Sequence, residues 1–188
     1  MEKSSTREGA PATDKAALRR ALLAARTARA TAGSLADEAR RLREHVSALV
    51  AATAPAVVAA YMPFGTEPGG ADLPEYLALA VHEVIVPVLL PDKDLDWRPY
   101  DEPGRHLGVD AIARAQLVIV PAMAVDRAGY RLGRGGGSYD RALARVGPGA
   151  RIAALLHDGE LVPEVPHEPH DRRVHVALTA SGPVKLDR

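Results

Sequence analysis

The sequence contains no cysteine, and this absence removes several classes of function at once. Disulfide bonds, thiolate metal sites and a cysteine nucleophile are all excluded. The formal net charge is zero, which argues against bulk electrostatic attraction to nucleic acid or to an anionic membrane. No apolar run approaches the roughly 18 residues of a membrane span, and the N-terminus lacks the apolar segment of a signal peptide. We therefore expect a cytoplasmic protein that binds neither nucleic acid nor membrane.

Aromatic residues are also scarce, at 4% of the chain, so Ala and Val supply much of the 47% hydrophobic content. A chain of 188 residues is still long enough to bury one sizeable core. Residues 1–12 are small and polar and predict a flexible tail. The remaining residues, 13–188, are expected to form a single domain, which we expect to be a monomer.

Two helices are predicted before the first strand. The first begins at Thr13 or Asp14 and ends near residue 30, and Ser34 with Asp37 resembles a capping box for a second that ends near residue 53.

The first helix has a basic seam, formed by Lys15, Arg19 and Arg26 within an arc of ~40°. Leu18 and Leu22 lie beside it, so the seam borders the buried face. It is either an ordinary solvated face of an arginine-rich protein or a surface that faces an anion.

Short apolar runs separated by helical patterns make up the rest of the chain. They fit buried strands at 56–61, 83–90, 116–121, 151–156 and 174–179, while 95–100 alternates like an edge strand in a hairpin. Helical patterns cover 71–82, a short segment before 115, and 138–146. Strands that alternate with helices predict an α/β fold of three layers, with a mainly parallel sheet and helices on both faces.

A glycine-rich stretch over residues 126–141 separates the 116–121 strand from the 138–146 helix. It contains Gly133 and Gly135–Gly137, which allow close approach of the backbone to a ligand. Its arginines have the geometry that suits phosphate. Asp140 would repel phosphate, and fits better as a ligand for Mg²⁺.

Common phosphate loops do not match this stretch. A Walker loop needs a lysine that is missing, and the dinucleotide and kinase patterns need a glycine where Ser138 stands. A flexible surface turn is the alternative, but Tyr130, Leu132 and Tyr139 among fixed charges are unusual for a linker.

Residues 129–141, Gly-Tyr-Arg-Leu-Gly-Arg-Gly-Gly-Gly-Ser-Tyr-Asp-Arg, closely resemble the signature of the 5-formyltetrahydrofolate cyclo-ligase family. Other motifs of that family occur in the same order over about residues 14–180. They are the Lys15/Arg19 pair, Tyr61-Met-Pro followed by Glu67, Pro121 with Asp126, Val162-Pro163 and His170-Asp171.

The chain departs from the family pattern at three places. Ser138 stands where a tyrosine is usual, Glu67 is followed by Pro68-Gly69-Gly70, and Val125 stands where a phenylalanine is typical. These differences bear on substrate affinity and geometry more than on the reaction.

The resemblance implies that ATP and 5-formyltetrahydrofolate are converted to 5,10-methenyltetrahydrofolate, ADP and phosphate. It implies that Arg134 is catalytic and that Asp140 and Asp171 bind Mg²⁺. The implied ATP site comprises Lys15, Arg19, Arg131, Leu132, Gly133, Arg134, Gly135, Gly136, Gly137, Ser138 and Tyr139. The implied folate site comprises Met62, Glu67, Arg134, Gly135, Gly136, Gly137 and Ser138.

Two further interpretations remain open. One is a paralogue that binds folate or nucleotide in a regulatory role without turnover, which the departures at Ser138 and Pro68-Gly69-Gly70 would favour. The other is a histidine-zinc site over residues 167–175. Pro166 and Pro169 break helical spacing there and no second cluster could complete the site, so we expect a loop in which only Asp171 acts. The isolated histidines, such as His157, suggest packing or surface positions.

Overall fold

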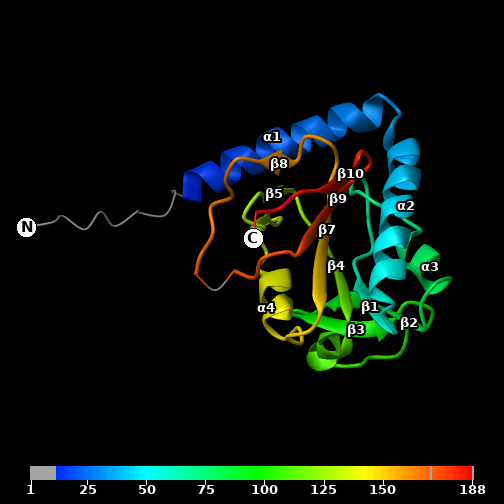
Figure 1. Cartoon of the computed structure of the whole chain (residues 1–188). Helices are drawn as coiled ribbons and strands as arrows, with labels where there is room; N and C mark the ends of the chain where they lie inside the picture. Colours follow the sequence, from blue (N-terminus) through cyan, green and yellow to red (C-terminus); the bar gives the residue numbers. More distant parts are fainter. Residues whose placement is uncertain (1–11, 170, 188) are drawn as a thin grey trace, which may run out of the picture.

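The computed structural model describes residues 12–169 and 171–187, with side chains from Lys15 onward (Figure 1). Helix α1 (Ala12–Thr31) and helix α2 (Leu35–Thr53) precede the first strand, as the sequence predicts. Residues 1–11 of the predicted tail lie outside the described residues. The predicted caps at Thr13 and Asp14 lie outside the residues whose side chains are described.

A seven-stranded sheet forms the centre of the molecule, in the order β10-β9-β7-β4-β1-β2-β3. Its five inner strands are parallel, and only the two edge strands are antiparallel to their neighbours. The predicted hairpin is the β2–β3 pair. The strands are β1 (Val57–Ala60), β2 (Glu83–Leu89), β3 (Leu95–Pro99), β4 (Leu117–Pro121), β7 (Arg151–Leu155), β9 (Val176–Thr179) and β10 (Gly182–Val184).

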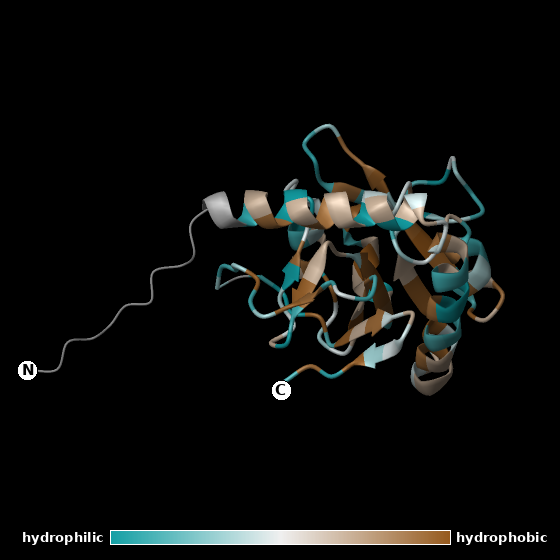
Figure 2. Ribbon diagram, turned by 90° about the horizontal axis from the view of Figure 1, so that it is seen from above, coloured by the Kyte–Doolittle hydropathy of each residue, from teal (hydrophilic) through white to brown (hydrophobic). Residues whose placement is uncertain are grey.

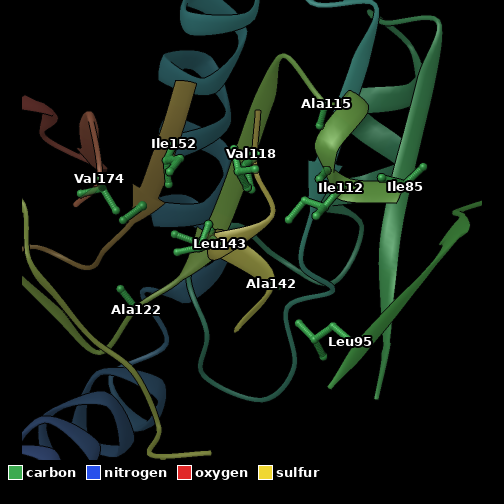
Figure 3. Packing of buried hydrophobic residues seen from close by; sticks show 14 of the residues in the cluster. Ile85, Leu95, Ile112, Ala115, Val118, Ala122, Ala142, Leu143, Ile152 and Val174 are labelled. Carbon is green, nitrogen blue, oxygen red and sulfur yellow. The ribbon is translucent and has the colours of Figure 1, made fainter. Parts of the chain in front are cut away.

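Both faces of this sheet are covered, which confirms the predicted three-layer class. Successive strand residues point to opposite faces, so Val58 joins the cluster with α2 while Ala59 joins the other. The first face also packs against α3 (Leu73–Ala78), and the second against the 3₁₀ helix η1 (Val109–Arg114) and α4 (Ser138–Ala144). Figure 3 shows the second cluster, where Leu143 of α4 meets strand residues of β4 and β7.

A second, three-stranded sheet lies beside the first and was not predicted. It consists of β5 (Ala124–Asp126), β6 (Arg131–Leu132) and β8 (Leu161–Val162), in the order β6-β5-β8. Helix α1 packs on it through Leu22, which contacts a cluster with Met123, Leu132 and Val165. Figure 2, seen from above, shows α1 crossing the strands with polar and apolar residues mixed along its length. Among the described residues, no helix is both long and apolar enough to traverse a bilayer.

Two local predictions were wrong. The helix expected over 71–82 is only Leu73–Ala78, because the chain must turn back after Leu79 to enter β2 at Glu83. The capping box at Ser34 does not form, since the Ser34 side chain donates to the Glu38 carboxylate at 2.7 Å instead of capping the helix.

Candidate functional site

The order of the strands creates a crevice at one end of the sheet. From β1 the chain moves to β2 on one side, whereas β4 pairs on the other side of β1. The crevice outside the carboxyl ends of two such strands is where α/β proteins bind ligands. A cavity of about 430 Å³ lies here, lined by Tyr61 after β1, Leu89 of β2, Pro121 of β4 and the glycine-rich stretch.

The lead-in to the glycines is a β5–β6 hairpin held by Asp126. This carboxylate is 3% exposed and accepts hydrogen bonds from the backbone N–H groups of Tyr130, at 2.9 Å, and Val165, at 3.0 Å. Gly129 turns the hairpin with a positive φ of 88°, which disfavours residues with a Cβ. The hairpin therefore fixes where the glycine loop, residues 133–137, begins.

The basic seam of α1 divides into two parts. The Arg19 Nε donates to the Gly133 carbonyl at 2.8 Å, and its guanidinium lies against Gly135, so this residue faces the glycine loop. Arg26 is instead buried in an ion pair with Glu160 at 2.6 Å and donates to the Ala122 carbonyl at 2.6 Å. The seam is thus partly structural.

Arg131 lies at the inner wall of the cavity, between an aromatic ring and a carboxylate. It pairs with Asp140 and lies 5.9 Å from the Tyr139 ring centroid. Burial lowers the pKa of the Arg131 guanidinium, while the charges of Asp140 and Asp171 raise it. The Arg131 Nε and the Tyr139 hydroxyl are buried without a hydrogen-bond partner within the described protein. Because buried polar groups are normally paired, these two unpaired atoms are unusual.

On the opposite wall, Glu67 and Phe64 hold Arg134. The Arg134 Nε lies 3.2 Å from a Glu67 oxygen, and its guanidinium lies over the Phe64 ring at 4.4 Å from the centroid. Burial raises the pKa of Glu67, although the Phe64 backbone N–H and the Arg134 charge act in the opposite direction. The loop that bears Glu67 is itself fixed, because the Tyr61 hydroxyl donates to the Pro68 carbonyl at 2.5 Å.

The two predicted metal ligands both lie near Arg131. Asp140 is paired with it, and Asp171 influences its pKa. Asp171 also accepts a hydrogen bond from the Glu168 N–H at 2.8 Å. Carboxylate oxygens such as those of Asp140 and Asp171 are the donors that Mg²⁺ prefers. Within residues 12–169 and 171–187, no three acidic, histidine or cysteine side chains form a metal cluster.

The cavity therefore brings together most of the predicted site residues. Four lie apart from its lining: Lys15 and Arg19, one turn apart on α1, Asp171, and Leu132, whose side chain is 2% exposed in the core under α1. Only the backbone of Leu132 is available to a ligand. The lining also includes Phe64, which the sequence analysis overlooked; being the only phenylalanine, just before Glu67, was a signal that could have identified it.

The histidines of the C-terminal segment have separate partners. The His167 ring stacks on Tyr130 with centroids 3.5 Å apart, and the His175 Nδ1 accepts the Ile152 N–H at 2.9 Å. His170 lies outside the described residues. Nothing in the described part of this segment gathers imidazoles around a zinc site.

Comparison with known proteins gives consistent relatives. A 5-formyltetrahydrofolate cyclo-ligase from Mycolicibacterium smegmatis is 37% identical over 148 residues, which cover 69% of this chain and 76% of that protein. A mitochondrial 5-formyltetrahydrofolate cyclo-ligase from Arabidopsis thaliana is 35% identical over 104 residues, covering 49% of this chain and 38% of that protein.

Solved structures share the fold. The 5,10-methenyltetrahydrofolate synthetase of Mycoplasma pneumoniae superposes with a TM-score of 0.74 at 19% identity, covering 89% of this chain and 99% of that one. The enzyme of the same name from Aquifex aeolicus gives 0.71 at 22% identity, covering 93% of each chain. The model of the 5-formyltetrahydrofolate cyclo-ligase family matches residues 11–180, and the chain belongs to that family.

Proposed function

We propose that this protein catalyses the ATP- and Mg²⁺-dependent closure of 5-formyltetrahydrofolate to 5,10-methenyltetrahydrofolate, with release of ADP and phosphate. The observation that carries the proposal is the single cavity in which the glycine loop and its arginines face the loop of Met62, Phe64 and Glu67. A phosphate-binding surface and a surface for a flat, polar ring system thus meet at one point.

The chemistry explains why both surfaces are needed. The oxygen of a formamide is a poor leaving group, so attack of N10 on the formyl carbon requires activation. Transfer of the γ-phosphoryl group to that oxygen gives an imino-phosphate, from which N10 displaces phosphate. Such transfer depends mainly on positioning and charge neutralisation, and it needs no side-chain nucleophile.

ATP would lie along the glycine loop. Arg19 already touches Gly133 and Gly135, and Lys15 lies one turn away on the same helix. Arg134 is exposed enough to reach a ligand, with 45% of its side chain accessible, and it lies beside the folate loop. We assign it the charge that develops on the transferred phosphoryl group.

The folate ring would lie between Met62, Phe64 and Glu67. The ring of Phe64 is 61% exposed, an unusual position for a large apolar group, whereas the hydroxyl of Tyr139 is buried. An exposed aromatic face on the cavity wall can take the place of the tyrosine that the family usually has at Ser138. The Glu67 carboxylate would accept hydrogen bonds from ring N–H groups.

Asp140 and Asp171 would hold Mg²⁺ together with phosphate oxygens and water. When bound, the ion would neutralise phosphate charge. Arg131 forms an ion pair with Asp140 and so balances its charge.

A binding protein without turnover is the second candidate, favoured by Ser138 and by the Pro68-Gly69-Gly70 segment. One assay distinguishes the two: the protein is incubated with 5-formyltetrahydrofolate, Mg²⁺ and ATP while the absorbance of methenyltetrahydrofolate is followed. We expect ATP-dependent product, and a loss of about 100-fold in Arg134→Ala with the fold left intact. Substrate binding without product would favour the second candidate. A monomeric state and a cytoplasmic location stay predictions.

A further inference from the structure

His157 is buried in the segment between β7 and β8 and contacts two other parts of the chain. Only 4% of the residue is exposed. Its Nδ1 lies 2.9 Å from a Glu38 oxygen on α2, and its Nε2 lies 2.9 Å from the Thr66 carbonyl oxygen. Thr66 immediately precedes Glu67, so the imidazole joins α2 to the loop that would bind folate.

Both partners of this ring are hydrogen-bond acceptors. A carbonyl oxygen can only accept, and an ionised carboxylate can only accept. Burial raises the pKa of Glu38, but hydrogen bonds from Ser34, Arg29 and His157 outweigh it and the net shift is downward. The Thr66 carbonyl oxygen can only accept, so the His157 Nε2 must carry a hydrogen and donate it to Thr66.

Charged groups surround the His157 ring. Glu38 and Glu160 supply two negative charges, and a Glu160 oxygen also accepts the His157 backbone N–H at 2.9 Å. These carboxylates are shared with two arginines of α1, which pair with Glu160 at 2.6 Å and with Glu38 at 2.9 Å. The charged groups on the elements packed around His157 are Arg26 and Arg29 of α1, Glu38 of α2, Asp158 and Glu160 of the β7–β8 segment, and Glu67 of the folate loop.

The loop is consequently fixed on both sides of Glu67. On one side the His157 ring binds the Thr66 carbonyl, and on the other the Tyr61 hydroxyl binds the Pro68 carbonyl. Within the loop, the Glu67 carboxylate accepts the Phe64 N–H at 3.2 Å. With the backbone held at Thr66 and Pro68, the direction of the Glu67 side chain into the cavity is set before any ligand binds.

We propose that His157 is a positioning residue for 5-formyltetrahydrofolate, which holds the Thr66–Glu67 backbone through its Nε2–H without touching the substrate. This role rests on the proposed function. The proposed role predicts that folate affinity depends on the hydrogen bond from the His157 Nε2–H, and not only on the volume that the ring occupies.

Two substitutions separate the ring's hydrogen bonds. The amide nitrogen of asparagine can take the place of Nδ1 and bind Glu38, whereas that of glutamine can take the place of Nε2 and bind Thr66. We expect His157→Asn to raise the KM for 5-formyltetrahydrofolate roughly tenfold, which is the upper value for one ordinary hydrogen bond. The KM for ATP should stay within about twofold, and His157→Gln should keep the folate KM within about threefold of wild type.

His82→Asn, the same change at an exposed histidine, is the matched control and should leave both KM values unchanged. If His157→Asn and His157→Gln raise the folate KM equally, or raise both KM values together, His157 is only a structural residue and the inference is wrong.

A second readout is independent of turnover. Hydrogen–deuterium exchange of the Phe64 and Glu67 amides, both bonded within the loop, should be faster in His157→Asn than in His157→Gln or wild type. If wild type makes no product, the proposed function fails, while this exchange pattern still decides whether His157 holds the loop. Equal exchange in all three proteins would overturn it.

Discussion

At the scale of single residues, the cavity contains a carboxylate, Glu67, whose burial disfavours its charged form. Only 6% of the Glu67 side chain is exposed, and the arginine that pairs with it, Arg134, is itself half-exposed to solvent. Burial is the largest influence on Glu67 and raises its pKa. A site that needs an ionised Glu67 for binding therefore gives up some stability of the fold.

This trade predicts opposite effects on stability and affinity in Glu67→Gln. The pKa of Glu67 is raised in the folded state above its ordinary value of 4.5. The ionised carboxyl therefore lowers the stability of the protein, and this loss grows as the pH rises from 4.5 through the folded-state pKa. At pH 7 the ligand-free variant should therefore melt above wild type, and the difference should vanish as the pH falls toward 4. Its folate KM should rise. Glu75→Gln, on an exposed part of α3, should change neither quantity, and a variant that melts below wild type at pH 7 would contradict the argument.

A second prediction concerns the aromatic wall. If the Phe64 ring stacks on the pterin, Phe64→Ala should raise the folate KM roughly two- to tenfold, the range expected for one aromatic pair. Adding Ser138→Tyr to that variant should restore part of the affinity, because the tyrosine would supply an aromatic face elsewhere on the same cavity. Steady-state kinetics with saturating ATP measure both effects. A folate KM that is unchanged in Phe64→Ala would remove the ring from the site.

At the scale of elements, the β5–β6 hairpin decides where the glycine loop starts. A Cβ at Gly129 would lie 2.7 Å from the Val174 carbonyl oxygen, on backbone with a φ of 88°. We expect Gly129→Ala to lower the free energy of unfolding by about 1–3 kcal/mol, measured by urea denaturation. Gly149→Ala, where nothing lies within 4 Å of the new Cβ, is the control and should stay close to wild type. Equal stability of the two variants would show that the hairpin tolerates the substitution.

The elements of the main sheet were predictable from the sequence because their patterns are local. Continuous apolar runs such as 116–121 require burial on both faces, and this led directly to parallel inner strands. The short strands β5, β6 and β8 have two or three residues each, too few for any period to show. The end of α3 was missed because the return of the chain to β2 sets it, rather than helix propensity.

The candidate site was also predictable only in part. The glycine stretch, Glu67 and the Arg19 side of the seam are adjacent in sequence to recognisable motifs. His157, Glu160 and the structural role of Arg26 depend on contacts between residues far apart in the chain. No spacing in the sequence distinguishes Arg26 from Arg19, since only the fold places one against Glu160 and the other against Gly133.

At the scale of the whole molecule, the Arg26–Glu160 pair joins α1 to the rest of the protein. The Arg26 and Glu160 side chains are 2% and 6% exposed. Removing one member of a buried pair leaves an unbalanced charge, so Arg26→Leu should lower the free energy of unfolding by about 3–5 kcal/mol.

The double variant Arg26→Leu/Glu160→Leu leaves no uncompensated charge and should recover a large part of that loss. Urea denaturation of the two variants and of wild type measures the difference. The expectation is contradicted if the double variant is as unstable as the single one.

The separation of these two residues also sets the order in which the molecule can be completed. Arg26 and Glu160 are 134 positions apart, and the apolar partners of Leu22 lie at residues 123, 124, 132 and 165. At a synthesis rate of about 5–20 residues per second, α1 leaves the ribosome roughly 7–27 s before Glu160 does. A lone helix of 20 residues is only marginally stable in water. Helix α1 is thus made before the residues that hold it in place, and the glycine loop gains its contact with Arg19 only when α1 docks.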